Sequence, residues 1–414
     1  MSRMFRLRST TKVLLAVGLL IGFLLAEAGL QFIAPHFDWY VVPKPMDGLV
    51  KQGCQYWSKY THHQTVPNCT TVIPPSVLDG IEEISLEYNA DGLRGPVIDQ
   101  DPKQHPRLLL LGDSFLQAEG VPYEKTMGVL LNQLMGERLD VLQHGVSSWS
   151  PVTQLAWLTR YGERLDVDHV YLFVVDNDFF SASAFENSDE AYRLLYSFAD
   201  DGTPLVMETL RAPPLLPLWL FRSKVVSLML APFGFTQIRS PSVVPEKVNV
   251  PESLNPIVHA SSLRRVVVER LMIRLDPALW DASLRKGAAA TLKSLRTFTR
   301  YLAHRDISLV VVYLPLGLDI DAHESMIARE RMQLVEGIYF GDVGLDRWLR
   351  EQLTLEGIAF LSLTQTLRET KVSLAPNGRN ILYYSSDGHL NKTGHRAVAK
   401  ALYHHLEGTV SSSR

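Results

Sequence analysis

Three residues that could together activate a hydroxyl nucleophile lie in two segments far apart in this sequence. Ser114 ends a Gly-Asp-Ser sequence that directly follows the apolar run Leu108–Leu111, and Asp387 and His389 come shortly before a predicted C-terminal helix. A serine attacks a carbonyl carbon near neutral pH when a histidine takes its proton and a carboxylate orients that histidine. We therefore predict Ser114 as the nucleophile, His389 as the general base and Asp387 as the residue that orients His389.

Each of these residues also has a purely structural interpretation. Asp and Ser are preferred at helix N-caps, so the segment around Ser114 could simply start a helix. His395 competes with His389 as the base, but it falls inside the predicted C-terminal helix. Asp387 and His389 are two residues apart, so in an extended loop their side chains leave on the same side. Placement directly after a core strand favours the catalytic interpretation of Ser114.

The elements that must position these residues are read from the hydrophobic pattern. Five apolar runs are continuous, as expected for strands buried on both faces, and helical segments alternate with them. The strands are predicted at 107–111, 140–143, 169–175, 308–314 and 358–363, and the clearest helices at 127–135, 288–304, 345–355 and 392–406. This alternation predicts an α/β fold with a doubly wound parallel sheet in three layers. Ligands bind such sheets at the carboxyl ends of the strands, where Ser114, Gly145 and Asn177 fall.

The N-terminal residues predict export from the cytoplasm. A basic segment precedes the apolar run 13–34, which only Glu27 and Gln31 interrupt. This run is long enough to span a bilayer, and its basic flank predicts that the rest of the chain lies outside the cytoplasm. A cleaved signal peptide with a core at 13–26 is the alternative. We favour an uncleaved anchor, because apolar residues resume after Ala28.

The predicted organisation follows from these segments. A cytoplasmic tail (1–12) and a transmembrane anchor (13–34) precede an extracytoplasmic segment (35–104) and a main α/β domain (105–407). An insertion at about 180–287 interrupts this domain. Its apolar part, 213–235, predicts a helical cap, with a membrane-surface helix as the alternative.

Cysteine and histidine usage argues against metal chemistry. The two cysteines, Cys54 and Cys69, predict a disulfide that would stabilise the fold by about 3 kcal/mol, with free thiols as the alternative. The adjacent pairs His62-His63 and His404-His405 do not face one ligand point, so we predict surface histidines and no metal site. No Gly-rich phosphate loop follows a strand, so no cofactor is expected. A net charge of -3 gives no support for nucleic-acid binding.

Four sequence blocks resemble those of the SGNH, or GDSL, hydrolases, which have a flavodoxin-like sheet. The blocks are Gly-Asp-Ser114-Phe, His144-Gly145-Val146-Ser147, Asp176-Asn177-Asp178 and Asp387-Gly388-His389-Leu390-Asn391. The resemblance implies that the backbone N–H groups of Ser114 and Gly145 and the side chain of Asn177 form an oxyanion hole. The usual last block has Asp-x-x-His, whereas this chain has Asp-x-His. That spacing, the N-terminal anchor and Asn89-x-x-Gly92-x-Arg94-Gly95 are similar to the branch of alginate-type O-acetyltransferases, membrane-anchored proteins of bacterial polysaccharide pathways.

The predicted function is an extracytoplasmic serine esterase or O-acyltransferase, such as an O-acetyltransferase, anchored in the bacterial inner membrane and facing the periplasm. The resemblance implies an acylated carbohydrate as substrate and polysaccharide-biosynthesis proteins as partners. Two alternatives belong to other classes: a lipid-directed esterase or lysophospholipase with 213–235 as a lid, and a non-catalytic polysaccharide-binding or assembly subunit. The complete set of Ser114, Asp387 and His389 argues against the last one, because a binding module needs no such set.

Overall fold

The computed structural model describes most of the main domain and parts of the segments around it. The described residues are 9–33, 50–52, 54–58, 61–76, 80–96, 103–179, 196–198, 204–207, 225, 277–280, 282–321, 344–375, 381–384 and 388–412. Predictions for Asp387 and for nearly all of the apolar segment 213–235 therefore fall outside the described residues.

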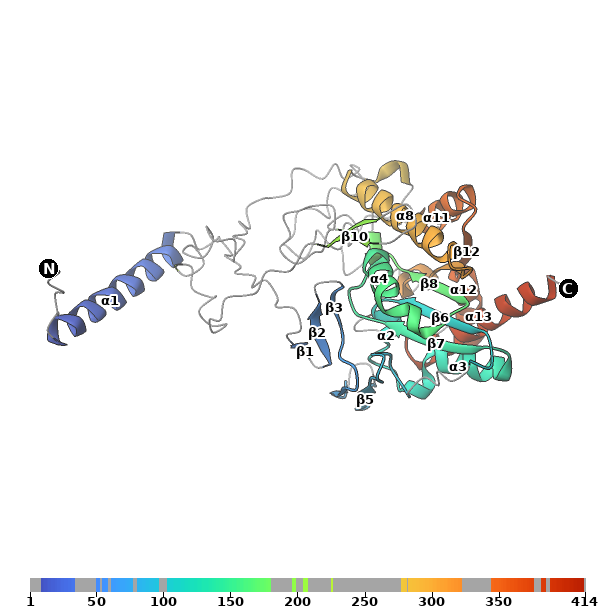
Figure 1. The fold of residues 1–414 in the computed structure, drawn as a ribbon, viewed down its shortest axis with the longest axis horizontal. Helices are drawn as coiled ribbons and strands as arrows, with labels where there is room; N and C mark the ends of the chain where they lie inside the picture. The colour runs from blue at the N-terminus through green and yellow to red at the C-terminus, as the bar shows by residue number, and fades with distance from the viewer. Residues whose placement is uncertain are drawn as a thin grey trace. The chain divides into compact units, whose positions relative to one another are not determined.

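A five-stranded parallel sheet forms the centre of the main domain (Figure 1). Its strands are β6 (Arg107–Gly112), β7 (Asp140–Gly145), β8 (His169–Val174), β11 (Ser308–Tyr313) and β12 (Ala359–Ser362). They lie in the order β12-β11-β8-β6-β7. The five runs predicted as strands are these five strands, each within two residues at either end. The predicted α/β class with a doubly wound parallel sheet is confirmed.

This strand order creates a switch point between β6 and β8. The strand that follows β6 in the chain, β7, lies beside β6 in one direction along the sheet. The next strand, β8, lies beside β6 in the opposite direction. The order is that of flavodoxin-like sheets, in which ligands bind outside the carboxyl ends of the strands at the switch point. Gly112 and Val174 end the two strands there, so the residues that follow them are placed for chemistry.

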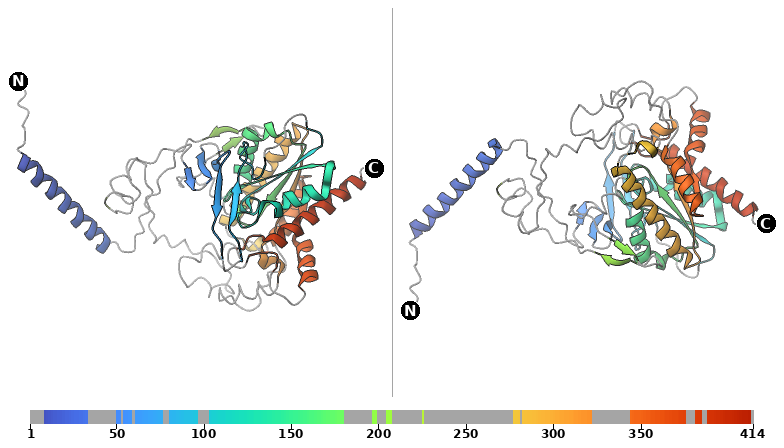
Figure 2. Two further views of the ribbon diagram at one scale, coloured as in Figure 1. Left: turned by 90° about the horizontal axis from the view of Figure 1, so that it is seen from below. Right: turned by 90° about the horizontal axis from the view of Figure 1, so that it is seen from above.

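Helices cover both faces of the sheet. On one face, Leu108 and Leu110 belong to a buried cluster that includes residues of α3 (Met127–Met135), α12 (Thr364–Leu374) and α13 (Lys392–Ser412). Side chains alternate along a strand, so Leu109 and Leu111 point to the opposite face. There α4 (Pro151–Trp157) and α8 (Ala282–Ala303) pack together, and α11 (Gly344–Leu355) packs on β12. Figure 2 shows α13 beside α3 in one view and α8 along the sheet in the other.

The remaining helical elements of the main domain are short. They are the α-helices α2 (Ser114–Gln117) and α9 (Gly317–Ile320), 3-10 turns at Tyr123–Lys125, Gly136–Arg138, Glu163–Leu165 and Pro277–Leu279, and a π-helical turn at Leu158–Gly162. Helix α12 was not predicted, although it packs on the core through Leu367.

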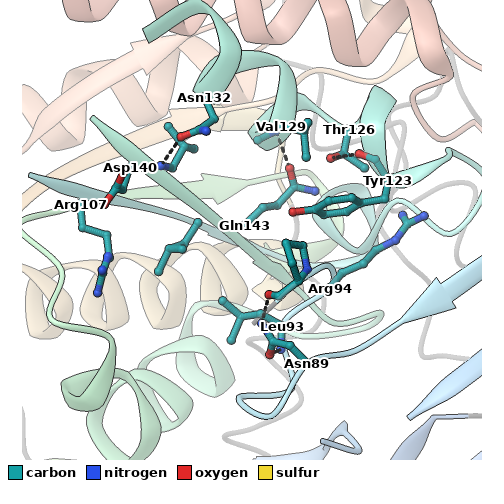
Figure 3. Close-up of a pocket in the computed structure, with 14 residues that line it drawn as sticks. Asn89, Leu93, Arg94, Arg107, Tyr123, Thr126, Val129, Asn132, Asp140 and Gln143 are labelled. Carbon is teal, nitrogen blue, oxygen red and sulfur yellow. Dashed lines mark hydrogen bonds between the residues drawn. The ribbon is translucent and has the colours of Figure 1, made fainter. Parts of the chain in front are cut away.

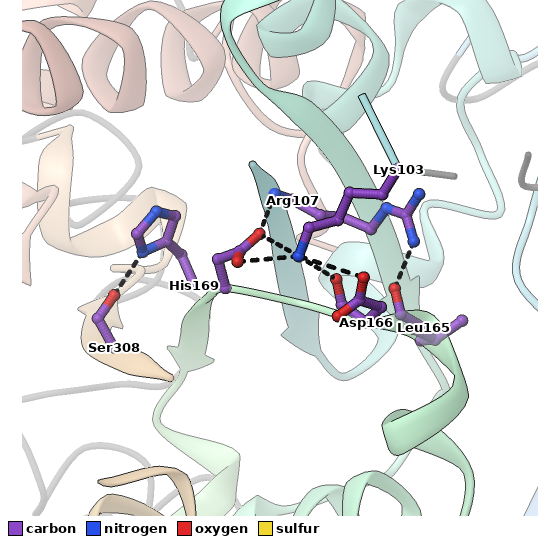
Figure 4. Close-up of polar contacts among 7 residues, drawn as sticks. Lys103, Arg107, Leu165, Asp166, His169 and Ser308 are labelled. Atoms are coloured by element: carbon purple, nitrogen blue, oxygen red, sulfur yellow. Dashed lines mark hydrogen bonds and ion pairs between the residues drawn. The ribbon is translucent and has the colours of Figure 1, made fainter. Parts of the chain in front are cut away.

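Polar contacts tie the amino ends of three strands together (Figure 4). The Lys103 ammonium lies 2.9 Å from an Asp168 carboxylate oxygen, and the same carboxylate accepts a 2.7 Å hydrogen bond from the Arg107 backbone N–H. Next to them, His169 Nδ1 and Ser308 Oγ are 2.7 Å apart. These contacts fix the starts of β6, β8 and β11, at the edge of the sheet opposite to Ser114.

The segment before β6 contains strands that its weak periodicity did not predict. β1 (Val50–Gln52), β2 (Gln55–Ser58) and β3 (His62–Thr65) form an antiparallel sheet, and β4 (Thr70–Ile73) pairs with β5 (Ile84–Glu87). A disulfide joins Cys54 and Cys69 across a sequence separation of 15 residues. Within the insertion, β9 (Tyr196–Phe198) pairs with β10 (Pro204–Met207).

The N-terminal helix α1 (Ser9–Ile33) belongs to a separate compact unit from the sheet, which lies in the unit formed by Gly48–Thr209 and Asn249–Arg414. Among the described residues, no helix combines the length and the apolar character that a membrane span requires. This finding does not support the transmembrane anchor predicted at 13–34.

Candidate active site

The turn from β6 into α2 presents Ser114. β6 ends at Gly112, and Asp113 caps α2 by accepting a 3.0 Å hydrogen bond from the Phe115 backbone N–H. Ser114 is the first residue of α2 and is partly exposed. The first N–H groups of a helix have no partner within it, and its positive end stabilises negative charge nearby. The strand-turn-helix sequence therefore exposes the Ser114 hydroxyl beside a backbone N–H suited to an oxyanion.

His389 lies next to this hydroxyl. Its Nε2 atom is 2.8 Å from Ser114 Oγ, although the two residues are 275 positions apart in the sequence. The loop that carries His389 is closed by a 2.8 Å hydrogen bond from the Tyr384 N–H to the His389 carbonyl. The Phe115 ring lies 4.7 Å from the imidazole. With the unprotonated Nε2 facing the hydroxyl, the imidazole can take the Ser114 proton.

The structure describes His395, the competing base, but not Asp387, the residue predicted to orient His389. Asp387 lies outside the described residues. His395, the competing base, is completely buried, and its Nδ1 accepts a 3.1 Å hydrogen bond from the Met127 N–H. Burial lowers the pKa of His395 to about 3, so this side chain stays neutral. His395 lies on α13 and packs against the start of α3, so its role is in packing.

Gly145 is the last residue of β7 and lies directly beside the turn that carries Ser114. It is paired with Gly112 in the sheet. A Cβ atom at position 145 would lie 2.4 Å from the Asp113 carbonyl oxygen and 2.4 Å from the Gln117 nitrogen. Both contacts are with backbone, so only glycine lets α2 pack this closely. The structure thus brings Gly145 to the segment that carries Ser114.

Asn177 follows β8 and faces the same turn. Its Nδ2 donates a 3.1 Å hydrogen bond to the second carboxylate oxygen of Asp113. The prediction had its side chain donating to an oxyanion, whereas in this structure one amide hydrogen goes to Asp113. The contact fixes the orientation of the amide, since the reverse orientation would place oxygen against carboxylate. Among the described residues, the second hydrogen of Nδ2 has no acceptor.

Two buried carboxyl groups accompany these residues. Burial raises the pKa of Asp113, although hydrogen bonds from Phe115 and Asn177 oppose the shift. Burial and the nearby Asp113 raise the pKa of Asp178 still further above its ordinary value. Asp178 accepts from the Val175 N–H through one oxygen, and its other oxygen has no partner in the part of the chain that the structure describes. We assign the charge to Asp113, which has two donors, and the proton to Asp178.

One histidine that was predicted at the surface is buried beside the site. His63 is only 2% exposed, and its Nε2 lies 2.7 Å from the Ser147 carbonyl oxygen. The Trp149 indole N–H donates a 2.7 Å hydrogen bond to the His63 carbonyl. The prediction was wrong because β3 packs against the loop after β7, and the consecutive residues His63, Gln64 and Thr65 are all buried there. No local sequence signal marks this contact.

A second buried histidine gives a pH prediction. Burial lowers the pKa of His144 to about 3, and its ring stacks on Trp157 at 4.1 Å. Because the unfolded chain binds a proton near pH 6.5 and the folded chain does not, stability is lost as pH falls from about 6.5 towards 3. His144→Phe removes this linkage. Between pH 7 and 5, we expect wild type to lose about 2 kcal/mol more of its unfolding free energy than the variant.

Urea denaturation of both proteins at pH 7 and pH 5 measures this difference. The carboxyl groups are the same in both proteins, so their contribution to the pH dependence of stability cancels in the comparison. Parallel loss of stability in the two proteins would contradict a neutral, buried His144.

A cavity of about 260 Å³ lies elsewhere, beside the edge strand β7 (Figure 3). Its polar side chains bond to the protein itself: Asn132 accepts from the Val141 N–H at 2.9 Å, and Gln143 accepts from the Gly128 N–H at 2.7 Å. Neither Ser114 nor His389 lines it. Within the described part of the chain, no group of three His, Cys, Asp or Glu side chains could hold a metal ion.

The fold and this site define a class: an α/β protein whose serine and histidine meet at the carboxyl edge of a parallel sheet. Comparisons with known protein families and with curated proteins find no match. Solved structures that this chain resembles are G-D-S-L hydrolases and esterases. A member of the lipolytic protein G-D-S-L family from Veillonella parvula has 11% identity and a TM-score of 0.33, with coverage of 71% of this chain and 94% of that one.

Two further structures are similar to the same degree. A carbohydrate acetylesterase family member from Sinorhizobium meliloti has 11% identity and a TM-score of 0.35, covering 74% of this chain and 99% of its own. The M. smegmatis aryl esterase has 12% identity and a TM-score of 0.33, covering 73% and 99%. At these values, the likeness decides neither the family nor the activity of this chain.

Proposed function

We propose that this protein is a serine acyl-ester enzyme of the SGNH type. The observation that carries the proposal is the 2.8 Å approach of His389 Nε2 to Ser114 Oγ at the carboxyl end of the sheet. Gly145 and Asn177 come to the same turn from the two strands beside β6. A nucleophile, a base and oxyanion donors are the groups that acyl transfer requires.

The reaction has two halves. Ser114 Oγ bonds to the ester carbonyl carbon while His389 Nε2 takes the hydroxyl proton. The negative oxygen that develops is stabilised by the Ser114 and Gly145 N–H groups and by the free Asn177 N–H. As the carbon–oxygen bond of the ester breaks, His389 returns the proton to the departing alcohol, which leaves an acyl group on Ser114. In the second half, His389 takes a proton from an acceptor whose oxygen bonds to the acyl carbon. The bond from that carbon to Ser114 Oγ then breaks, and His389 gives the proton to Ser114 Oγ.

The acceptor determines the reaction class. Water makes the protein an esterase, and a sugar hydroxyl makes it an O-acyltransferase, with the same residues in the same roles. The Asp387-x-His389 spacing and the Asn89–Gly95 segment resemble the alginate-type O-acetyltransferases. On that resemblance, we propose acetyl esters of an envelope or secreted polysaccharide as substrate.

We propose that the enzyme works outside the cytoplasm. The Cys54–Cys69 disulfide supports this location, because disulfides persist in oxidising compartments and are rare in the cytosol. Attachment to a membrane stays a prediction from the sequence. Alkylation of the protein in intact cells tests the location, and two free thiols would contradict it.

The proposed activity is tested by comparing wild type with Ser114→Ala on aryl acetates. We expect the variant to lose at least about 10³-fold in kcat, since the covalent path is removed. Ser148→Ala is the matched control: Ser148 is an exposed serine three residues after Gly145, and its loss should leave turnover unchanged. Equal turnover by wild type and Ser114→Ala would refute the serine mechanism. The same reaction is then run with an oligosaccharide acceptor. Acetylated sugar as product would show an O-acyltransferase, and free acetate would show an esterase.

A further inference from the structure

We propose that Arg94 is a positioning residue of the acyl-transfer site, which rests on the function proposed above. Arg94 lies outside the sheet, in the segment before β6, and does not contact Ser114 or His389 in any described hydrogen bond. It holds the end of helix α2. Through that helix, it fixes both Ser114 and the loop that follows Gly145.

Helix α2 needs support from outside because it has only four residues. The last four carbonyl groups of a helix have no hydrogen-bond partner within the helix. In a helix of one turn, nearly every carbonyl group is therefore without such a partner. The chain then leaves α2 through Ala118, which has a left-handed backbone with φ of 54°. The Arg94 guanidinium donates to the carbonyls of Ala118 and Val121 at 2.6 Å each and to that of Gln117 at 3.2 Å. One side chain thus binds three carbonyls, one at the last residue of the helix that begins with Ser114 and two just after it.

The position of Arg94 is itself fixed by its loop. The Asn89 side chain accepts hydrogen bonds from the N–H groups of Asp91 and Leu93 at 2.9 and 3.0 Å, and it donates to the Pro96 carbonyl. Gly92 has a φ of +75°, and a Cβ there would lie 2.8 Å from the Thr65 hydroxyl. This explains the Asn-x-x-Gly-x-Arg spacing physically. Asn89 and Gly92 shape the turn that aims Arg94 at α2, and Figure 3 shows Asn89, Leu93 and Arg94 in this loop.

The same end of α2 also receives the Gly145 loop. The Gln117 backbone nitrogen is one of the atoms against which Gly145 packs, and the Gln117 side chain accepts a 2.6 Å hydrogen bond from the Ser147 N–H. The Gln117 amide in turn donates to the Tyr88 hydroxyl at 3.1 Å. A shift of α2 would therefore move Ser114 and the Gly145 N–H relative to each other. Acyl transfer is sensitive to such a shift, because a displacement of about 1 Å can cost about 10²-fold in rate.

The chemistry of this contact requires arginine. The guanidinium is planar and has five donors in a fixed arrangement, whereas a lysine ammonium is a point charge on a flexible stem. A positive charge is also favourable at the carboxyl end of a helix, where the carbonyl oxygens point. Arg94→Lys therefore keeps the charge but cannot bind the three carbonyls at once.

The test compares wild type, Arg94→Ala and Arg94→Lys in two assays: hydrolysis of an aryl acetate and labelling of Ser114 by a fluorophosphonate. We expect Arg94→Ala to lose about 10²-fold in kcat and in labelling rate with KM nearly unchanged. Arg94→Lys should lie between it and wild type. Free guanidinium, added well below denaturing concentrations, should restore part of the rate of Arg94→Ala.

Arg164→Ala provides the matched control. Arg164 Nε lies 3.1 Å from the Asp91 carboxylate on the same loop but makes no described contact with α2. It should leave both rates unchanged. Wild-type rates in Arg94→Ala would overturn the inference. So would a loss of rate that matches a loss of fold, or full activity in Arg94→Lys, because a merely structural arginine gives those results. Failure of wild type in both assays would instead refute the proposed function.

Discussion

Replacing His389 by alanine is expected to lower kcat/KM for an aryl acetate by about 10⁴- to 10⁶-fold, as large a loss as removal of Ser114 itself should cause. The imidazole lies 2.8 Å from Ser114 Oγ, and without it the hydroxyl keeps its proton at neutral pH. Serine and histidine act as one unit, so the double variant Ser114→Ala with His389→Ala should lose no more than either single variant. Steady-state kinetics of the three proteins measures this.

Two results would distinguish a base from a histidine that only packs in the loop. His404→Ala removes an exposed histidine of α13 and should leave kcat/KM unchanged. Multiplication of the two single effects in the double variant would show that Ser114 and His389 act independently. That outcome would contradict the general-base role of His389.

Replacing Gly145 by alanine is expected to change both the stability and the activity of the protein. The added methyl group would lie 2.4 Å from two backbone atoms of the nucleophile segment, and backbone cannot move aside as a flexible side chain can. Overpacking of this kind costs about 1 to 3 kcal/mol of unfolding free energy. Displacing the Gly145 N–H from the oxyanion should also lower kcat by about 10²- to 10³-fold.

Chemical denaturation and kinetics at one temperature measure these two effects. Gly408→Ala is the control, since a Cβ at this helical position meets nothing within 4 Å. It should leave kcat unchanged and stabilise the protein by up to about 1 kcal/mol. A Gly145→Ala protein with wild-type stability and turnover would show that α2 does not pack on this residue as described.

The sheet could be predicted from the sequence because its strands are buried on both faces. Runs such as Leu108–Leu111 are continuous and apolar, so their type and approximate ends follow from composition alone. The strands before β6 could not be predicted in this way. β2 and β3 are short and rich in polar residues, and they depend on pairing with each other and on the nearby Cys54–Cys69 disulfide.

The candidate site divides in the same manner. Ser114, Gly145 and Asn177 follow predicted strands, so their meeting at one edge of the sheet follows from the topology. The role of Gln117, and the burial of His63 against the Ser147 carbonyl, arise from contacts between loops that no local pattern encodes. The contact of Asn177 with Asp113 is of this kind as well, because it depends on the exact angle between two turns.

The separation of 275 residues between nucleophile and base has a consequence during synthesis. At about 5 to 20 residues per second, a ribosome that has placed Ser114 in the chain needs roughly 15 to 55 s more to reach His389. Throughout that interval the serine lacks His389, the base proposed above, and is an ordinary alcohol. On the mechanism proposed above, the growing polypeptide cannot attack esters during this time. Reactivity begins only when α13 docks against α3 and brings its preceding loop to the edge of the sheet.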